Sequence, residues 1–314
     1  MFVTKKKIHE KERFYLEKSI RLLNGKIKKF SLYLKDYNEN INLQGYEEKL
    51  NKKIEQEQIA FIVSYYEKDY IFDEKLIKEL ELMKLNYKSI ITKLTKKQLE
   101  DIIDRFAINF TYESNAIEGN SLTLKDVTIL LTEKKVIKRK DLREIYETLN
   151  TKEALNLIFE NKFKIKKEDI IKLHSIIVKD TGVTIGYKKF PNFLLGRNIK
   201  TTSPEFVEKE INELIFWYNN TKMHPLKKAI VFHGKFEKIH PFEDGNGRTG
   251  RMLVNIILLN NDYPPIIIRK THKLSYFSAL EAFDNKHQDK LIRFFIEKYK
   301  DTYKKFFEIY FKYL

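Results

Sequence analysis

The sequence predicts a mainly α-helical fold with small β pieces. Apolar and charged residues recur at the spacing of amphipathic helices over most of the 314 residues. Only 10 glycines and 6 prolines occur, and five of these helix breakers gather in residues 180–206. Apolar residues make up 42% of the chain, which predicts a globular protein with a sizeable core rather than a disordered one.

The first hundred residues are expected to form a β-hairpin followed by helices. Residues 13–21 and 26–35 alternate apolar and polar side chains on either side of Asn24 and Gly25, a pair typical of hairpin turns. Residues 46–110 contain no proline and keep helical spacing, so this segment is expected to be helical.

Further helices are expected after this region, interrupted by one irregular stretch. Ser121 and Thr123 are suitable N-terminal caps for a helix that follows them. The breakers in residues 180–206 predict a hairpin or flap. Helical periodicity marks the segments 143–159, 205–220, 229–240, 248–260, 275–284 and 290–314.

Composition excludes several classes of function. The absence of cysteine excludes disulfides and thiolate metal sites. No apolar run approaches the ~18 residues of a membrane span, and MFVTKKK lacks the apolar core of a signal peptide, so we expect a cytoplasmic protein with no membrane partner. The formal charge is +16, but it comes from 50 lysines and only 10 arginines spread along the chain. Specific nucleic-acid binding is therefore not expected, because it favours clustered arginines.

One glycine-rich stretch, HPFEDGNGRTGR at residues 240–251, has the features of an anion site. Gly245 and Gly247 free the backbone to adopt positive φ, and Asn246 tolerates it. Successive amides in such a turn can point at an anion, and the helix that follows adds its unpaired N–H groups. The stretch is not a P-loop, because no Gly-Lys-Ser/Thr follows, and no strand precedes it as in a Rossmann loop.

The charged residues of this stretch indicate a metal–nucleotide site. Arg248 and Arg251 are three residues apart and share a face of the following helix. Asp244 would repel a polyphosphate unless a hard cation such as Mg²⁺ lay between them. His240 precedes Asp244 by four residues and could take a proton from an incoming hydroxyl, although a lone histidine can also be a hydrogen-bonded core residue. A zinc site is not expected, since no HExxH motif and no cysteine occur.

The same twelve residues resemble the signature of the Fic (filamentation induced by cAMP) family, His-x-Phe-x-Asp/Glu-Gly-Asn-Gly-Arg-x-x-Arg. All eight specified positions match. The similarity extends over residues 98–298 and predicts an all-α Fic domain with a small β-hairpin flap. Residues 1–97 then form an N-terminal hairpin and helical region of unknown role, and residues 299–314 a C-terminal helical extension.

The resemblance implies transfer of AMP from ATP to a hydroxyl group of a target protein, with release of pyrophosphate. His240 would be the general base, and Asp244 would bind Mg²⁺. Gly245–Gly247 would cradle phosphate, and Arg248 and Arg251 would neutralise it. Removal of AMP by the same site stays open, as does the formation of a homodimer.

The resemblance also implies a flap and a nucleobase pocket. The flap would pair with an extended segment of the target protein through Phe193, Leu194, Leu195 and Gly196. Tyr276 and Phe277 would line the base pocket, although an aromatic pair can equally be core packing. Asp284 stands where relatives often have Asn, which leaves the nucleotide open.

A second stretch, SNAIEGN, resembles the family's inhibitory motif Ser/Thr-x-x-x-Glu-Gly/Asn through Ser114, Glu118 and Gly119. Gly119 is a natural helix stop, so Glu118 would lie in the last turn, where the helix dipole disfavours a carboxylate and a cationic partner is expected. The alternative is a solvated glutamate. The resemblance implies that Glu118 pairs with Arg251 and keeps the enzyme off, as in the class with an N-terminal inhibitory helix.

Two alternative functions are weighed against this one. The first is a basic nucleic-acid-binding or toxin–antitoxin regulator with a secondary Fic site. The second, within the enzyme class, is transfer of another nucleotide or of phosphocholine. Gly247 favours nucleotidyl transfer, because the Doc branch of the family, which phosphorylates, has lysine at this position.

Overall fold

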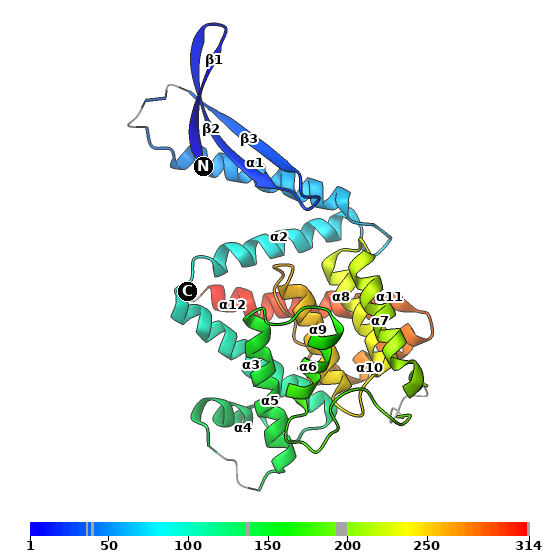
Figure 1. Cartoon of the computed structure of the whole chain (residues 1–314). Coiled ribbons are helices and arrows are strands. Elements are labelled where there is room, and N and C mark those ends of the chain that lie inside the picture. Colours follow the sequence, from blue (N-terminus) through cyan, green and yellow to red (C-terminus); the bar gives the residue numbers. More distant parts are fainter. Residues whose placement is uncertain (36, 39–40, 136–138, 193–199, 313–314) are drawn as a thin grey trace. The chain divides into compact units, whose positions relative to one another are not determined.

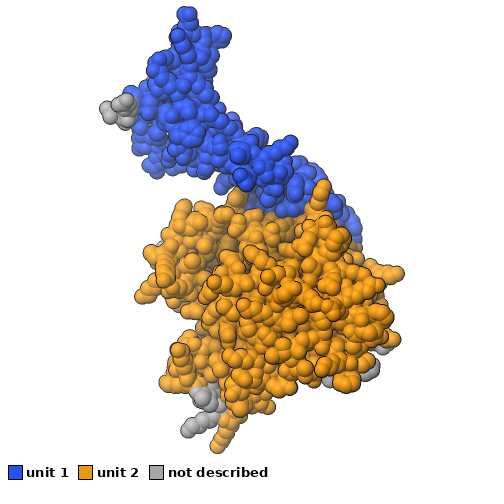
Figure 2. Space-filling view, in the orientation of Figure 1, with its two compact units in different colours: residues 1–82 blue, residues 83–314 orange. Residues whose placement is uncertain are grey.

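The computed structural model describes all residues except 36, 39–40, 136–138, 193–199 and 313–314. The chain divides into two compact units, Met1–Leu82 and Met83–Leu314, coloured separately in Figure 2. The division at residue 82 falls within one helix, α2 (Glu74–Ile91). The expected domain limits at residues 98 and 298 stay predictions.

The first unit contains a three-stranded antiparallel sheet in the order β1 (Phe2–Ile8), β2 (Lys11–Arg21) and β3 (Ile27–Leu34). The hairpin predicted around Asn24 and Gly25 is confirmed, since β2 and β3 pair from Phe14↔Leu34 to Arg21↔Ile27. One face of the sheet packs on helix α1 (Gln44–Tyr65) through a small core of Leu16, Phe30, Leu34, Leu50 and Ile54.

Strand β1 was not predicted. It joins β2 through a turn of only two residues, His9 and Glu10, both with positive φ (47° and 62°). Glycine, asparagine or aspartate usually occupies such positions, so the sequence carries no turn signal here.

The region 46–110 is helical as expected, but it is broken twice. Helix α1 ends at Tyr65, and α2 is followed by α3 (Lys96–Glu118). The first break holds an aspartate turn, in which Oδ1 of Asp69 accepts hydrogen bonds from the amides of Ile71 and Phe72. The second ends at Thr95, whose side chain forms a capping box with Gln98.

The second unit is helical (Figure 1). Short turns of π-helix at Ile129–Glu133 and Tyr303–Phe307, and of 3₁₀-helix at Lys270–His272, interrupt it. After α3 its α-helices are α4 (Leu124–Thr128), α5 (Leu142–Phe159), α6 (Lys167–Ile177), α7 (Pro204–Asn220), α8 (Pro225–Ile239), α9 (Asn246–Leu259), α10 (Lys273–Asp284), α11 (Gln288–Thr302) and α12 (Glu308–Phe311).

Helices α8 and α9 form the centre of this unit. Most of their residues are buried, so neither helix has the polar face that a surface helix shows. Gly250 allows the two to approach closely, since a Cβ atom there would lie 2.5 Å from Oε1 of Glu237 on α8. The glycine-rich stretch forms the loop that joins them and the first turns of α9, so it rests on the most buried part of the fold. Among the residues described, no helix combines the length and apolar character needed to cross a bilayer.

Candidate active site

His240 occupies the C-terminal cap of α8 in a left-handed conformation (φ 50°, ψ 61°). Its Nδ1 lies 3.3 Å from the carbonyl oxygen of Glu237. A carbonyl can only accept a hydrogen bond, so Nδ1 is the donor, and in the neutral imidazole Nε2 carries the lone pair. This geometry suits His240 to accept a proton at Nε2.

The loop after His240 is held by Asn246, the first residue of α9. Its side chain bonds both backbone groups of Phe242, accepting from the amide at 2.9 Å and donating to the carbonyl at 2.8 Å. Gly245, with φ 78°, makes the turn into the helix. The expectation of positive φ at Gly247 and Asn246 was wrong, because both already lie in α9 and Gly245 alone makes the left-handed turn.

His174 on α6 supports the loop from behind. Its ring stacks on Phe242, with ring centroids 3.7 Å apart, and its Nε2 lies 3.0 Å from the carbonyl oxygen of Asp244. Burial lowers the pKa of His174 to about 4. The imidazole is therefore neutral at pH 7 and donates through Nε2.

A cavity of about 510 Å³ lies over this loop. Small-molecule sites typically span about 300–1,000 Å³, so a nucleotide-sized ligand is within range. His240, Asp244, Gly245–Gly247 and Arg251 line it together. The remaining lining residues are Ile117, Glu118, Asn192, Glu237, Glu243, Lys273, Tyr276 and Phe277.

Asp244 lies between cations at the edge of the cavity. Its Oδ1 accepts a hydrogen bond from the amide of Gly245 at 2.6 Å. Its Oδ2 forms an ion pair with Arg143 of α5 and lies 3.6 Å from Nη2 of Arg248. Among the residues described, no group of three or more histidine, cysteine, aspartate or glutamate side chains could hold a metal. A metal bound at Asp244 would therefore be held by fewer than three such side chains among the residues described.

Arg248 and Arg251 have different partners. Arg248 is buried and forms an ion pair with Glu147 of α5 (Nη1 to Oε1, 3.1 Å), and it does not line the cavity. The guanidinium of Arg251 does line it. The predicted phosphate role thus has a direct geometric basis for Arg251, whereas for Arg248 it stays a prediction.

Arg251 is bound by the end of α3. It donates to Oγ of Ser114 at 3.0 Å and to the carbonyl oxygen of Ser114 at 2.9 Å, and its Nη1 lies 2.7 Å from Oε1 of Glu118. Burial opposes the charge of Arg251, but Glu118, Tyr276 and Glu237 together outweigh burial and raise the pKa of the guanidinium. Gly119 ends the helix with φ 108°, as predicted. The cationic partner expected for Glu118 is thus Arg251.

Gly247 makes room for Glu118. A Cβ atom at this position would collide with Oε1 of Glu118 and come within 3.0 Å of Nη1 of Arg251. A side chain at this position would displace the Glu118 carboxylate from where it now lies. Any ligand atom placed above Gly247 would occupy the space that the carboxylate now fills.

The aromatic pair Tyr276 and Phe277 lies between the core and the cavity. Tyr276 is 1% exposed and its hydroxyl bonds Nε2 of His233 at 2.7 Å, as a core residue does. Burial raises its pKa above the usual range. Tyr276 and the half-buried Phe277 both line the cavity, while Asp284, at the end of α10, does not.

The described part of the predicted flap is attached to the loop around His240. The amide of Lys188 donates to the carbonyl of Pro241 at 2.9 Å, and Tyr187 bridges to Phe242. The buried Lys188 ammonium bonds Asn192 (2.7 Å) and Thr201 (3.0 Å), and burial lowers its pKa to about 8. The flap residues Phe193, Leu194, Leu195 and Gly196 lie outside the described residues.

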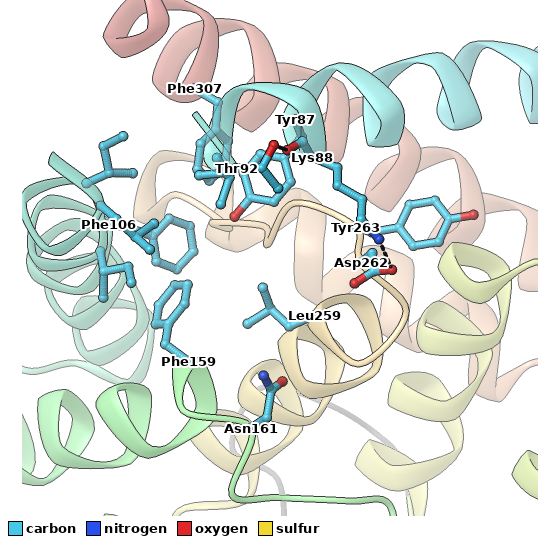
Figure 3. A pocket seen from close by; sticks show the side chains of 14 residues that line it. Tyr87, Lys88, Thr92, Phe106, Phe159, Asn161, Leu259, Asp262, Tyr263 and Phe307 are labelled. Carbon is cyan, nitrogen blue, oxygen red and sulfur yellow. Dashed lines mark hydrogen bonds and ion pairs between the residues drawn. The ribbon is translucent and has the colours of Figure 1, made fainter. Parts of the chain in front are cut away.

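A second cavity, of about 290 Å³, lies within the second unit and is mainly apolar (Figure 3). Its walls include the rings of Tyr87, Phe106, Phe159 and Phe307, and an ion pair between Lys88 and Asp262 (2.9 Å) lies among its lining residues. It holds no histidine and no glycine-rich loop, so the chemistry belongs to the first cavity.

Several residues of the first site were not predicted. Arg143 and Glu147 reach it from α5, His174 from α6, and Lys188 from the flap. None of them stands in a recognisable local pattern. Their role depends on tertiary contacts that join segments far apart in the sequence.

Comparisons with known proteins agree with this geometry. Residues 164–258 match the model of the Fic/DOC family. Protein adenylyltransferase fic-1 of Caenorhabditis elegans is 30% identical over 182 residues, 55% of this chain and 36% of that protein. Protein adenylyltransferase Fic of Nematostella vectensis is 31% identical over 191 residues, 58% of this chain and 44% of that protein. The chain thus spans less than half the length of these curated relatives.

Solved structures share the fold. A Fic-domain signaling protein from Bacteroides thetaiotaomicron superposes with a TM-score of 0.65 at 25% identity, covering 72% of this chain and 94% of that one. A Fic family protein from Desulfovibrio desulfuricans gives a TM-score of 0.60, also at 25% identity, over 71% of this chain and 73% of that one. Both agree with the prediction of a mainly α fold. The chain therefore contains a Fic/DOC family domain, whose signature loop joins α8 to α9.

Proposed function

We propose that this chain is a protein adenylyltransferase that moves AMP from ATP to a hydroxyl group of a target protein. The observation that carries the proposal is the meeting of His240, Asp244, Arg251 and the N-terminus of α9 at one nucleotide-sized cavity. Nucleotidyl transfer needs a base, a carboxylate that can bind a metal ion, and hydrogen-bond donors that bind the phosphates. The adenylyltransferase names of the curated relatives support the same reaction class.

The residues present fit a Mg²⁺ ion that arrives with the nucleotide. Magnesium commonly takes one or two protein carboxylates and completes its shell with phosphate oxygens and water. Asp244 is the carboxylate of the glycine-rich loop nearest Gly245–Gly247 on the cavity wall, 43% exposed, and it already attracts positive partners. Asp244 would hold the ion, which would offset the charge of the leaving pyrophosphate.

His240 would start the reaction by taking the proton of the target hydroxyl at Nε2. The hydroxyl oxygen then attacks the α-phosphorus of ATP, and the bond between that phosphorus and the bridging oxygen to the β-phosphate breaks. Amides at the start of α9 and the Arg251 guanidinium would bind the phosphate oxygens as charge moves to pyrophosphate.

The resting enzyme would be off. Arg251 can offer its guanidinium to the phosphates only after Glu118 releases it, because the carboxylate lies 2.7 Å from Nη1 and above Gly247. Glu118 is also one-third exposed at the cavity, where it could orient water for removal of AMP. The target segment would pair with the flap, and the homodimer stays a prediction.

Intact mass spectrometry tests the function. Wild type, Glu118→Gly and Glu118→Gly/His240→Ala are incubated with ATP and Mg²⁺ and examined for self-modification. The proposal expects the mass of AMP on Glu118→Gly and none on the double variant. If ATP binds but no variant ever gains AMP, on itself or on proteins added from a lysate, the assignment is wrong.

A further inference from the structure

The sheet of the first unit has a basic, aromatic outer face. Val3, Leu16 and Phe30 belong to the face that packs toward α1, so residues in the alternate positions point the other way. The pairing register places these outer residues side by side across the three strands. They include the aromatic side chains Phe2, Tyr15 and Tyr33 and the cations Lys6, Lys11, Arg13, Arg21 and Lys29.

The outer aromatic rings are accessible. Phe2 is 51% exposed and Tyr33 46% exposed, although aromatic side chains are usually covered. Tyr15 and Tyr33 are direct cross-strand partners with ring centroids 5.6 Å apart. They form a small platform of rings at the middle of the face.

Cations lie over the two rings of this platform, which are tilted by 55° to each other. The ammonium of Lys6 lies 4.7 Å from the ring centroid of Tyr15, and the guanidinium of Arg13 lies 5.9 Å from that of Tyr33. Within the strands, Glu17 is the one carboxylate on this face. Lys29 (2.5 Å) and Lys6 (2.7 Å) form ion pairs with it and hold its pKa at about 2, so its charge is cancelled locally.

We infer that this outer face binds single-stranded nucleic acid, with bases stacked on the tyrosines and phosphates beside the cations. Both the bases and the backbone of such a ligand are complementary to this face. Every base has a π-face that can stack on an aromatic ring, and every phosphodiester carries a negative charge that can pair with a cation. An acidic protein segment would satisfy the cations alone. The bases of a duplex are already stacked on one another and could not reach the rings.

The number and spread of charged residues in the sequence did not predict a basic face on this sheet. Lysines and arginines in the strands alternate with apolar residues and with the acidic residues Glu10, Glu12 and Glu17. Strand pairing then collects cations from three separate segments on one surface. The inference does not depend on the adenylyltransferase proposal, because no residue of the first cavity takes part.

Fluorescence anisotropy of the full chain with labelled oligonucleotides of about 12 residues tests the inference. We expect single-stranded RNA and DNA to bind more tightly than a duplex of the same length. The affinity for single strands should fall with salt, with a log–log slope of up to about −3.5 if all five cations contact phosphates. Preferential duplex binding, or equal competition by polyglutamate of matched charge, would overturn the inference.

Two variants separate the rings from the charges. Tyr33→Ala should weaken binding about fivefold or more, since loss of one stacked base costs at least ~1 kcal/mol, while Tyr33→Phe should retain it. Arg13→Gln/Arg21→Gln should reduce the salt slope by about 1.4. These arginines do not pair with the buried Glu17, so the sheet should keep its fold, which circular dichroism verifies.

Matched controls come from the same unit. Lys52→Gln/Lys53→Gln removes two cations from exposed positions of α1, and Tyr70→Ala removes a tyrosine that is 71% exposed. Both should bind as wild type does. If these controls lose as much affinity as the sheet variants, the binding is a property of net charge and the sheet is not the site.

Discussion

Oε1 of Glu118 lies 2.7 Å from Nη1 of Arg251, and the same guanidinium donates to both the side chain and the backbone of Ser114. Through these contacts, the end of helix α3 binds the guanidinium of Arg251, the arginine that lines the cavity. Removing one partner of a buried ion pair leaves the other charge uncompensated. Without Glu118, the buried guanidinium of Arg251 would therefore bind another anion strongly. The γ-phosphate of ATP is the anion that the proposed function supplies.

Glu118→Gly should raise the rate of AMP incorporation more than tenfold. Loss of ~1.4 kcal/mol of pairing already gives that factor. Glu100→Gly is a matched control, because it places glycine in the same helix at an exposed site away from the cavity. Equal rates for wild type and Glu118→Gly would refute autoinhibition by this residue.

His240→Ala should reduce transfer by ~10²–10⁴-fold, the usual loss when a general base is removed. ATP affinity should change little, because in the proposed function the phosphates would contact α9 and Arg251 instead. Isothermal titration with ATP and a turnover assay measure the two quantities separately. His287→Ala, at an exposed position, serves as the control. Near-wild-type turnover in His240→Ala would remove the residue from the mechanism.

Asp244→Ala should abolish the advantage of MgATP over metal-free ATP in binding, since the phosphates lose their bridging cation. The structure adds a second consequence. Asp244 is a partly exposed carboxylate on the cavity wall, so its loss also removes a negative charge that would repel bare phosphates. Binding of metal-free ATP should therefore hold or strengthen. Glu243→Ala, the neighbouring carboxylate at the cavity, is the control. An unchanged dependence on Mg²⁺ would show that Asp244 is not a ligand.

His174 should make stability fall with acid. Burial lowers its pKa from 6.5 to about 4. Between pH 6.5 and pH 4, His174 is therefore protonated in the unfolded chain and neutral in the folded protein. Its contribution to stability is complete above pH 6.5 and is lost as the pH falls to 4, by roughly 3 kcal/mol. Urea unfolding of wild type and His174→Phe at several pH values measures the difference. Parallel profiles for the two proteins would contradict the burial argument.

Local signals predicted the parts of the fold that local chemistry decides. The Asn24-Gly25 turn, the cap at Thr123 and the stop at Gly119 all lie where the sequence placed them. The signature stretch identified the site because its residues are contiguous and its turn depends on Gly245.

The parts that were missed depend on tertiary structure. His9 and Glu10 make a hairpin turn that has no typical turn residue, and the fold of the sheet holds them in it. Arg143 and Lys188 reach the site from other segments, so no spacing rule could connect them with Asp244 or Pro241. Gly247 was assigned to a positive φ, but it lies in α9, and its missing Cβ leaves the space that the Glu118 carboxylate fills.

The central claim is that AMP is transferred in the cavity over the α8–α9 loop. The most direct test is to label ATP at one phosphate and to measure which label stays on the protein. Glu118→Gly is incubated with Mg²⁺ and ATP labelled at either the α- or the γ-phosphate, and protein-bound label is measured after denaturation. The account predicts that the α-label stays on the protein, that the γ-label leaves with pyrophosphate, and that His240→Ala in the same background retains neither. Retention of the γ-label would show phosphoryl transfer and contradict it.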